Sequence, residues 1–205
     1  MKVIAVSQRV DVISNRNESR DALDQRLVNF LFSIDCLALP VPNYFGGFSK
    51  DIYETNDGFT AWIDLIKPDA ILLSGGNDIG NCNKRDVTET RLVDYAQKHK
   101  IPLLGICRGM QMMAHLSGRN LGVVSGHVAT RHVITGEINA TVNSFHNLGF
   151  KSIPDGYKIL ACDEGGVIEA MRHLHLPWEG WMWHPEREKP FVDADLSRAR
   201  KLFYA

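Results

Sequence analysis

Residues 101–117 read Ile-Pro-Leu-Leu-Gly-Ile-Cys-Arg-Gly-Met-Gln-Met-Met-Ala-His-Leu-Ser, and the rest of the chain is organised around them. A short apolar strand, 103–106, runs directly into a helix through Gly105-Ile106-Cys107-Arg108-Gly109. The two glycines allow the strand and the helix to pack closely around a sharp bend. This spacing is typical of an elbow that carries a nucleophile. The sequence therefore predicts that Cys107 projects from a strand-to-helix turn.

Cys107 has two interpretations. At the first turn of a helix, a thiol lies at the positive end of the helix dipole, which favours the thiolate. Free cysteine is also among the most buried residue types, so a small core side chain is the alternative. The helix favours the first interpretation, because polar side chains that could hold a substrate leave the elbow beside the thiol, namely Arg108, Gln111 and His115.

Length and charge narrow the class of protein. A chain of 205 residues, 44% hydrophobic, is long enough for one ample core, and we expect a single domain over residues 1–205. The formal charge of -1 and the absence of long Lys/Arg runs argue against a nucleic-acid polymer or a membrane surface as partner. We therefore expect small-molecule ligands. The sequence leaves open whether the chain forms a homo-oligomer.

The four cysteines are far apart, with no C-x-x-C pair, and Lys2 is followed by only four apolar residues, too few for a signal peptide. These features predict a reducing, cytoplasmic compartment. The eight histidines contain no H-E-x-x-H pair, so a zinc hydrolase is disfavoured. We expect chemistry that requires no metal and no cofactor.

Up to residue 117, apolar strands alternate with amphipathic helices. The predicted strands are 3–6, 37–39, 70–73 and 103–106, and the predicted helices include 23–34, 61–67 and one that begins in a capping box, Asp86-x-x-Glu89. This order indicates a parallel sheet covered on both faces. Beyond Gly118 come short β-rich pieces at 123–124, 138–142, 157–161, 167–171 and 181–183, then a closing helix over 196–203. We expect a three-layer α/β fold with a mostly parallel, flavodoxin-like central sheet.

Three further stretches lie where open α/β sheets bind ligands, or close to them. Ser74-Gly75-Gly76-Asn77-Asp78 follows a strand, and its glycines allow backbone N–H groups to reach a developing oxyanion. The polar stretch 7–20 contains Arg9 and Arg16, and the segment 43–60 combines glycines with aromatic residues, as a loop covering a pocket would. Plain surface loops are the alternative for both stretches.

His184 is the favoured base among the histidines. It follows the apolar run Trp181-Met182-Trp183 and precedes Pro185-Glu186. In an extended segment, residues two apart point the same way, so Glu186 can orient the imidazole and leave its other nitrogen free for the thiol proton. A structural histidine is the alternative, and the cysteine elbow favours the catalytic interpretation.

These motifs resemble the class I glutamine amidotransferase superfamily, and most closely its γ-glutamyl-γ-aminobutyrate hydrolase (peptidase C26) branch. The matching segments are Ser74–Asp78, Gly105–Gln111, Val142-Asn143-Ser144-Phe145-His146 and His184-Pro185-Glu186. Arg85-Asp86-x-x-Glu89 also resembles that branch. Cys-Arg-Gly-x-Gln is the specific signature, whereas Gly-Gly-x-Asp alone is weak.

The resemblance implies roles at matching positions. Cys107 is the expected nucleophile, His184 the base and acid, and Glu186 its orienting carboxylate. Backbone N–H groups of Gly75 or Gly76 and of Arg108 are expected to form the oxyanion hole. The α-amino and α-carboxylate groups of a glutamyl unit would contact Gln111, Ser144, Phe145 and His146. One departure is that Asn147 and Leu148 follow His146, where the family commonly has Gln two places on.

The resemblance implies cleavage of a γ-glutamyl amide through a thioester, with water as second substrate. Gln8-Arg9-Val10-Asp11 and Arg20–Arg26 resemble a subgroup associated with capsular polysaccharide phosphoramidate synthesis, in which a γ-glutamyl nucleotide amidate is the substrate. Arg9 and Arg16 would then bind the leaving portion. Two alternatives stay open: a glutaminase subunit that delivers ammonia to a partner synthetase, and a binding module with an inactive elbow.

Overall fold

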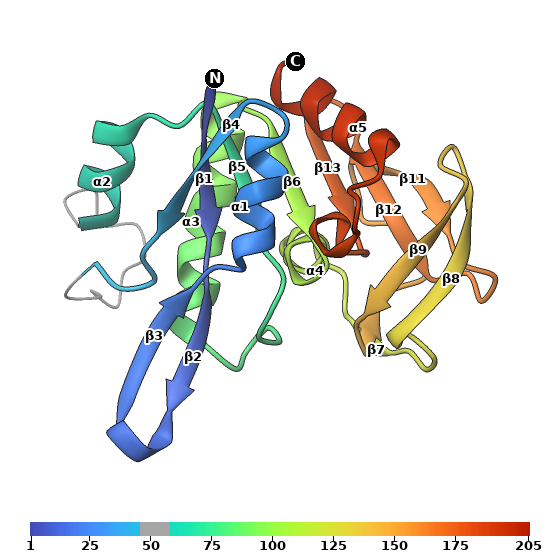
Figure 1. Ribbon diagram of the computed structural model, residues 1–205, viewed down its shortest axis with the longest axis horizontal. Helices are drawn as coiled ribbons and strands as arrows, with labels where there is room; N and C mark the ends of the chain where they lie inside the picture. The colour runs from blue at the N-terminus through green and yellow to red at the C-terminus, as the bar shows by residue number, and fades with distance from the viewer. Residues whose placement is uncertain (46–57) are drawn as a thin grey trace.

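A nine-stranded sheet forms the middle of the molecule (Figure 1). The computed structural model describes residues 1–45 and 58–205. Five strands are mutually parallel, in the order β4 (Cys36–Val41), β1 (Lys2–Ser7), β5 (Ala70–Leu73), β6 (Leu103–Ile106) and β13 (Trp178–Trp181). The sheet continues antiparallel through β12 (Ile168–His173), β11 (Tyr157–Cys162), β8 (Val128–Gly136) and β9 (Ala140–Phe145).

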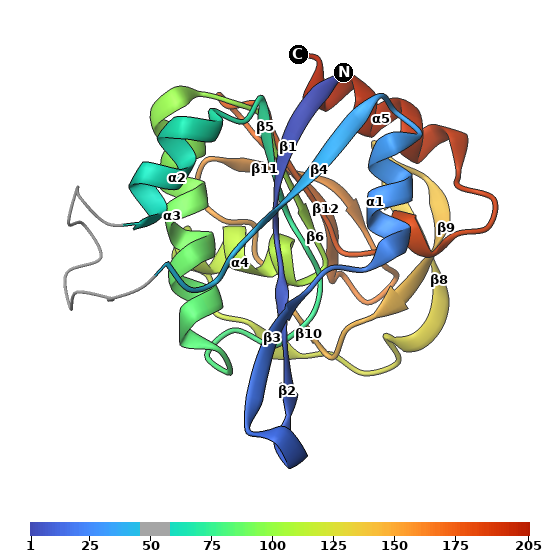
Figure 2. The same cartoon turned by 60° about the vertical axis from the view of Figure 1, so that its left-hand side comes forward.

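Helices cover both faces of the sheet, as Figures 1 and 2 show. Helices α1 (Gln25–Phe32) and α5 (Asp193–Phe203) pack on one face, and α2 (Gly58–Ile66), α3 (Asn83–His99) and α4 (Arg108–Leu116) pack on the other. The expected α/β fold, with a mostly parallel central sheet between two helical layers, is confirmed.

The layers follow from the alternation of side chains along each buried strand. In β5, Ala70 and Leu72 belong to the core beneath α1 and α5, whereas Ile71 and Leu73 belong to the core beneath α3 and α4. Every residue of β5 is buried, which explains why the strand reads as a continuous apolar run.

The antiparallel half contains elements that the sequence did not predict. Strand β8 is largely exposed and interrupts its apolar residues with Thr130, Arg131 and His132, so it lacked the apolar signal of the other strands. Two short strands, β7 (Gly122–Val123) and β10 (Leu148–Gly149), form a separate pair.

The polar stretch after β1 is not a loop but a β-hairpin. Strands β2 (Arg9–Ile13) and β3 (Glu18–Ala22) pair antiparallel through a 3-10 turn, Ser14–Arg16, and the hairpin projects away from the body of the molecule (Figure 2). Its alternation of charged and β-branched residues fits a two-stranded ribbon.

The predicted capping box is also wrong. Helix α3 begins at Asn83, three residues before Asp86, and Cys82 occupies its N-cap without a side-chain cap. Asp86 and Glu89 instead accept hydrogen bonds from Arg108, because the first turns of α3 lie beside the start of α4.

Two further observations concern the cysteines and the search for membrane-spanning helices. The four cysteines are all free thiols. Across residues 1–45 and 58–205, no helix has both the length and the apolar character of a bilayer span.

Candidate active site

Cys107 lies at the tip of a tight elbow between β6 and α4. Its backbone adopts φ 50° and ψ -105°, a combination that costs a residue with a Cβ about 1–3 kcal/mol. The surrounding structure enforces this bend. A Cβ at Gly105 would lie 2.6 Å from the Gly109 carbonyl carbon, and one at Gly109 would lie 2.1 Å from the Leu73 oxygen. Only glycine at both positions allows the helix to start against the sheet.

His184 comes to the elbow from the neighbouring strand. Strands β6 and β13 are parallel, with Ile106 opposite Trp181, and the Cys107 amide donates to the Trp181 carbonyl oxygen at 2.7 Å. His184 lies three residues beyond the end of β13 and one residue before a 3-10 turn, Pro185–Arg187. Its Nδ1 lies 2.6 Å from Glu186 Oε1, so the imidazole and the carboxylate face each other as expected.

The electrostatics of His184 reflect two opposing effects. Burial lowers the pKa of the imidazole, but hydrogen bonds with Cys107 and Glu186 and the negative charges of both groups outweigh burial and raise the pKa to about 9. The structure thus brings the thiol, the imidazole and the carboxylate into one contiguous cluster. At neutral pH, the imidazolium form of His184 is favoured.

Asn143 holds the backbone of His184, a role that the sequence did not reveal. The Asn143 side chain donates to the His184 carbonyl oxygen at 2.8 Å and accepts from the His184 amide at 2.9 Å. Its Nδ2 also lies 2.7 Å from Glu188 Oε1. Asn143 belongs to the motif 142–146, but the motif suggested no partner for it.

The Gly75-Gly76 loop packs directly against the His184 ring. A Cβ at Gly75 would lie 2.5 Å from His184 Cε1, so a side chain there would displace the imidazole. Arg85 Nη2 donates to the carbonyl oxygens of Ser74 and Gly75, at 2.7 and 3.0 Å. In a trans peptide the N–H points opposite to the C=O, so the amides of Gly75 and Gly76 point away from Arg85. Their use in an oxyanion hole stays a prediction.

A buried ion cluster anchors both loops of the site. Arg108, next to Cys107, pairs with Glu89 and Asp86, and Arg85 Nε donates to Glu89 at 2.9 Å. Burial raises the pKa of Glu89, but the charges of Arg85 and Arg108 outweigh it and hold the carboxyl below its usual range. Ser7 Oγ adds a hydrogen bond to Glu89 at 2.8 Å. The Arg108 side chain is therefore engaged structurally, and only its amide is left for the predicted oxyanion role.

The four residues expected to bind a glutamyl unit lie in α4, in β9 and directly after β9. Gln111, in α4, is buried and donates to the Leu148 carbonyl oxygen at 2.8 Å. Ser144 ends the buried part of β9 and donates through Oγ to the His127 carbonyl oxygen. Phe145 is partly exposed, and its ring lies edge-on to His184 with centroids 5.8 Å apart. His146 is buried and faces away, towards Glu169.

Arg9 and Arg16 differ in position although both belong to the hairpin. Arg9 lines a small cavity of about 40 Å³ together with Gly75, Gly76, His184, Glu186 and Arg187. Arg16 lies in the turn at the far end of the hairpin, away from that cavity (Figure 1). The predicted covering loop, 43–60, falls mostly outside the described residues.

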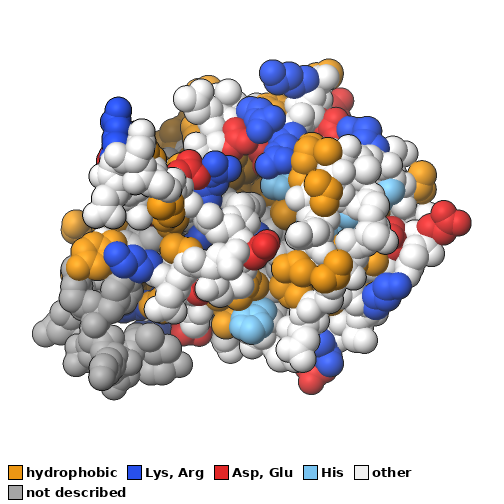
Figure 3. Space-filling view, turned by 90° about the horizontal axis from the view of Figure 1, so that it is seen from below, with side chains coloured by type: hydrophobic (Ala, Val, Ile, Leu, Met, Phe, Trp, Pro, Cys, Tyr) orange, Lys and Arg blue, Asp and Glu red, His pale blue; other side chains and the backbone are white. Residues whose placement is uncertain are grey.

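Figure 3 looks onto the face where the parallel strands end, and charged side chains of both signs are interspersed there with apolar ones.

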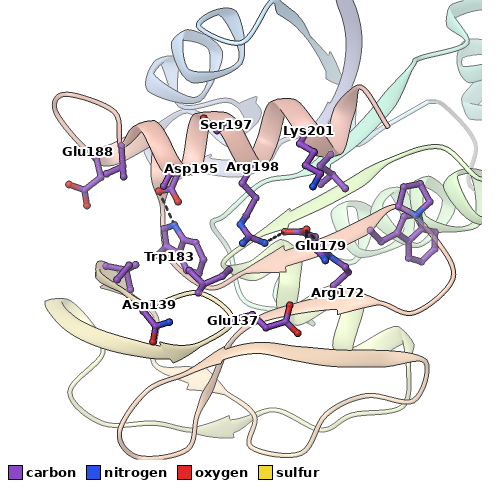
Figure 4. A pocket seen from close by; sticks show the side chains of 18 of the residues that line it. Glu137, Asn139, Arg172, Glu179, Trp183, Glu188, Asp195, Ser197, Arg198 and Lys201 are labelled. Atoms are coloured by element: carbon purple, nitrogen blue, oxygen red, sulfur yellow. Dashed lines mark hydrogen bonds and ion pairs between the residues drawn. The ribbon is translucent and has the colours of Figure 1, made fainter.

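A larger cavity, about 610 Å³, lies elsewhere in the described part of the chain. It lies between α5 and the antiparallel half of the sheet, lined by Arg172, Glu179, Arg198 and Lys201 among others (Figure 4). Cys107, His184 and Glu186 do not line it. Cavity volume alone would therefore not point to Cys107, His184 and Glu186.

Comparisons with known proteins show the family of the chain. The family model "Glutamine amidotransferase class-I" matches residues 47–193. A γ-glutamyl-CDP-amidate hydrolase from Campylobacter jejuni is 33% identical over 168 residues, covering 75% of this chain and 82% of the relative. A glutamine-hydrolysing GMP synthase subunit from Thermococcus kodakarensis is 32% identical over 151 residues, covering 66% and 76%. A glutamine amidotransferase structure from Thermotoga maritima shares the fold, with a TM-score of 0.64 at 15% identity over 99% of this chain and 82% of that one.

Proposed function

Since the chain belongs to the class I glutamine amidotransferase family, we propose that it is a hydrolase of γ-glutamyl amides in which Cys107, His184 and Glu186 form the catalytic triad. The observation that carries this proposal is the contact of an imidazole, oriented by a buried carboxylate, with a cysteine held at a strained elbow.

The reaction follows from this arrangement. The Cys107 thiolate attacks the γ-carbonyl carbon, a C–S bond forms, and the carbonyl oxygen becomes an oxyanion. The amides of Gly75, Gly76 and Arg108 are the proposed donors to that oxyanion, each worth about 3–4 kcal/mol to the transition state. His184 Nε2 gives its proton to the leaving nitrogen as the C–N bond breaks. Water, deprotonated by the same nitrogen, then cleaves the thioester and releases glutamate.

For the leaving portion we propose a nucleoside diphosphate that carries the amide nitrogen on its terminal phosphorus, as in γ-glutamyl-CDP-amidate, the substrate named for the Campylobacter jejuni relative. Arg9 and Arg187 line the cavity beside His184, and guanidinium groups bind phosphate oxygens in pairs. The Arg187 guanidinium also lies 4.3 Å from the centre of the Phe145 ring, which fixes its plane. Such a substrate would place the chain in capsular phosphoramidate synthesis.

The decisive experiment measures glutamate release from γ-glutamyl-CDP-amidate, γ-glutamyl amines and glutamine. We expect the nucleotide amidate to be the best substrate and Cys107→Ala to abolish its turnover, whereas Cys82→Ala, a change at another thiol, should leave it unchanged. Glutamate release by Cys107→Ala at the parental rate would refute the nucleophile assignment.

The phosphate contact is tested separately with Arg9→Met. We expect a higher KM for the nucleotide amidate and an unchanged KM for glutamine. Arg20→Met is the matched control, because Arg20 lies in the same hairpin and pairs with Glu18 at the surface. Equal effects of the two substitutions would contradict a phosphate-binding role for Arg9.

A second candidate is a glutaminase subunit that supplies ammonia to a synthetase. The similarity to the glutamine-hydrolysing GMP synthase subunit supports it, although that alignment covers less of this chain than the first. The two candidates separate by the behaviour of the isolated chain. A free-standing hydrolase turns over the amidate alone, whereas a synthetase-dependent glutaminase would show substantial activity only after the synthetase is added.

A further inference from the structure

Three histidines and one glutamate from four segments converge in the antiparallel half of the sheet. His127 precedes β8, His132 lies within β8, His146 follows β9, and Glu169 lies in β12. The His127 and His146 Nε2 atoms lie 3.6 and 3.5 Å from Glu169 Oε1, and His132 Nε2 lies 3.5 Å from Glu169 Oε2. Atoms of His127, His132 and Glu169 that can bind a metal all lie within 4.8 Å of one another.

The polar atoms that face one another in this cluster are buried. Relative exposure is 7% for His127, 4% for His146 and 0% for Glu169. In the described part of the chain, the three Nε2 atoms and both Glu169 oxygens have no hydrogen-bond partner. Burying a carboxylate in this way is costly unless a cation or a donor compensates it. Unpartnered buried groups of this kind therefore point to a missing ligand.

Hydrogen bonds at Nδ1 of His127 and His146 determine whether Nε2 of each ring carries a proton or a lone pair. His127 Nδ1 lies 2.9 Å from the Ser125 carbonyl oxygen, and His146 Nδ1 lies 3.0 Å from the Leu148 carbonyl oxygen. A carbonyl oxygen only accepts, so each Nδ1 carries the proton. In the neutral ring, Nε2 then presents a lone pair to the carboxylate. Lone pairs that face one another need a cation between them, and metal-binding histidines are fixed in this manner by backbone carbonyls.

We propose that His127, His132 and Glu169, with His146 beside them, bind one divalent transition-metal ion, with zinc the best match. Zinc bonds of about 2.0–2.1 Å in a tetrahedron separate neighbouring ligand atoms by about 3.3 Å, close to the nitrogen–oxygen distances here. Those distances of 3.5–3.6 Å are too long for hydrogen bonds. Asp163 Oδ2 lies 3.1 Å from His127 Nε2, so a second carboxylate completes the charge balance of a divalent ion.

Because Glu169 is fully buried and His127 and His146 are nearly so, we assign the ion a structural rather than a catalytic role. The ion would join β8 and the end of β9 to β12. It would also hold His146, whose Nδ1 shares the Leu148 carbonyl oxygen with Gln111 of α4. The ion thus supports the backbone of Ser144-Phe145-His146 without reaching Cys107. No short spacing joins the four residues in the sequence, so only the folded chain reveals them.

The test measures bound metal rather than activity. The full chain is stripped with a chelator, dialysed against Zn²⁺, washed, and analysed by elemental mass spectrometry and thermal unfolding. We expect one equivalent of Zn²⁺ per chain and a rise in Tm of about 5–10 °C when free Zn²⁺ is 100 times Kd. Glu169→Gln and His132→Gln should each weaken Zn²⁺ binding by about 100-fold or more. His175→Gln, at an exposed histidine, should bind Zn²⁺ like the parent.

Co²⁺ provides a measurement that depends on no variant. The parent loaded with Co²⁺ should show the intense visible absorption of tetrahedral cobalt, which six-coordinate surface sites lack. A parent chain that retains well under one equivalent of Zn²⁺ and gains no Tm would overturn the proposal. So would a tetrahedral cobalt spectrum that survives unchanged in Glu169→Gln.

Discussion

Replacing Glu186 by glutamine removes one charge from the His184 environment and keeps the side chain's shape. The rise of the His184 pKa from 6.5 to about 9 corresponds to about 3 kcal/mol of preference for the imidazolium in the folded chain. Burial alone lowers this pKa, so the value depends on Cys107 and Glu186. In Glu186→Gln we therefore expect the pKa to fall by about one to two units, from about 9 towards the ordinary value of 6.5.

The consequence for stability has a definite sign. A group whose pKa is higher in the folded chain contributes stability that is fully present below its unfolded value of about 6.5 and is lost as pH rises through its folded value. We therefore expect urea unfolding to show Glu186→Gln less stable than the parent by about 1–3 kcal/mol at pH 6, with the difference shrinking towards zero as pH rises through about 9. Turnover should fall by up to about 10⁴-fold, because the imidazole loses its orienting partner.

Glu137→Gln is the control. Glu137 is an exposed carboxylate paired with Lys158 at the surface, so the substitution should leave both the pH dependence of unfolding and the turnover unchanged. A stability difference between Glu186→Gln and the parent that is the same at pH 6 and above pH 9 would refute the electrostatic argument. So would a pH–rate profile of Glu186→Gln that superimposes on that of the parent.

Asn143→Ala should lower kcat by about 10- to 100-fold with little change in KM, since it leaves the buried His184 backbone groups unpaired at a cost of about 1–3 kcal/mol each; Asn29→Ala on an exposed helix face is its control, and steady-state kinetics with urea unfolding check both. Gly75→Ala should reduce kcat by about 100-fold, because its methyl group displaces the imidazole; a parental kcat would contradict that contact. Glu89→Gln should destabilise the fold by about 3–5 kcal/mol, because it removes the carboxylate from a buried ion pair, and a Tm within a degree of the parent would show that the cluster is dispensable.

The parallel half of the fold could be predicted from the sequence because its strands are buried on both faces. The predicted strand 70–73 matches β5, and 103–106 matches β6. The antiparallel half was harder to predict. Strand β8 faces solvent along much of its length, so its register is set by pairing with β9 and β11 rather than by an apolar run.

The triad residues could be proposed from local motifs, because an elbow and a His-x-Glu step are short-range patterns. The contacts that hold these residues in place could not be proposed from local motifs. Asn143 reaches His184 across 41 positions, and Arg85 acts through carbonyl oxygens whose direction the sequence does not encode. The sequence pattern of Asp86 and Glu89 predicted a helix cap, but in the fold both carboxylates form ion pairs with Arg108 instead.

The pairing of β6 with β13 has a consequence for the order of events during synthesis. Cys107 leaves the ribosome long before His184, although their strands are neighbours in the finished sheet. A nascent chain that has exposed only residues 1–160 therefore carries the thiol without its proton acceptor. In the proposed mechanism, translation must pass Glu186 before amide cleavage can begin, so hydrolysis is delayed until every strand of the sheet has been made.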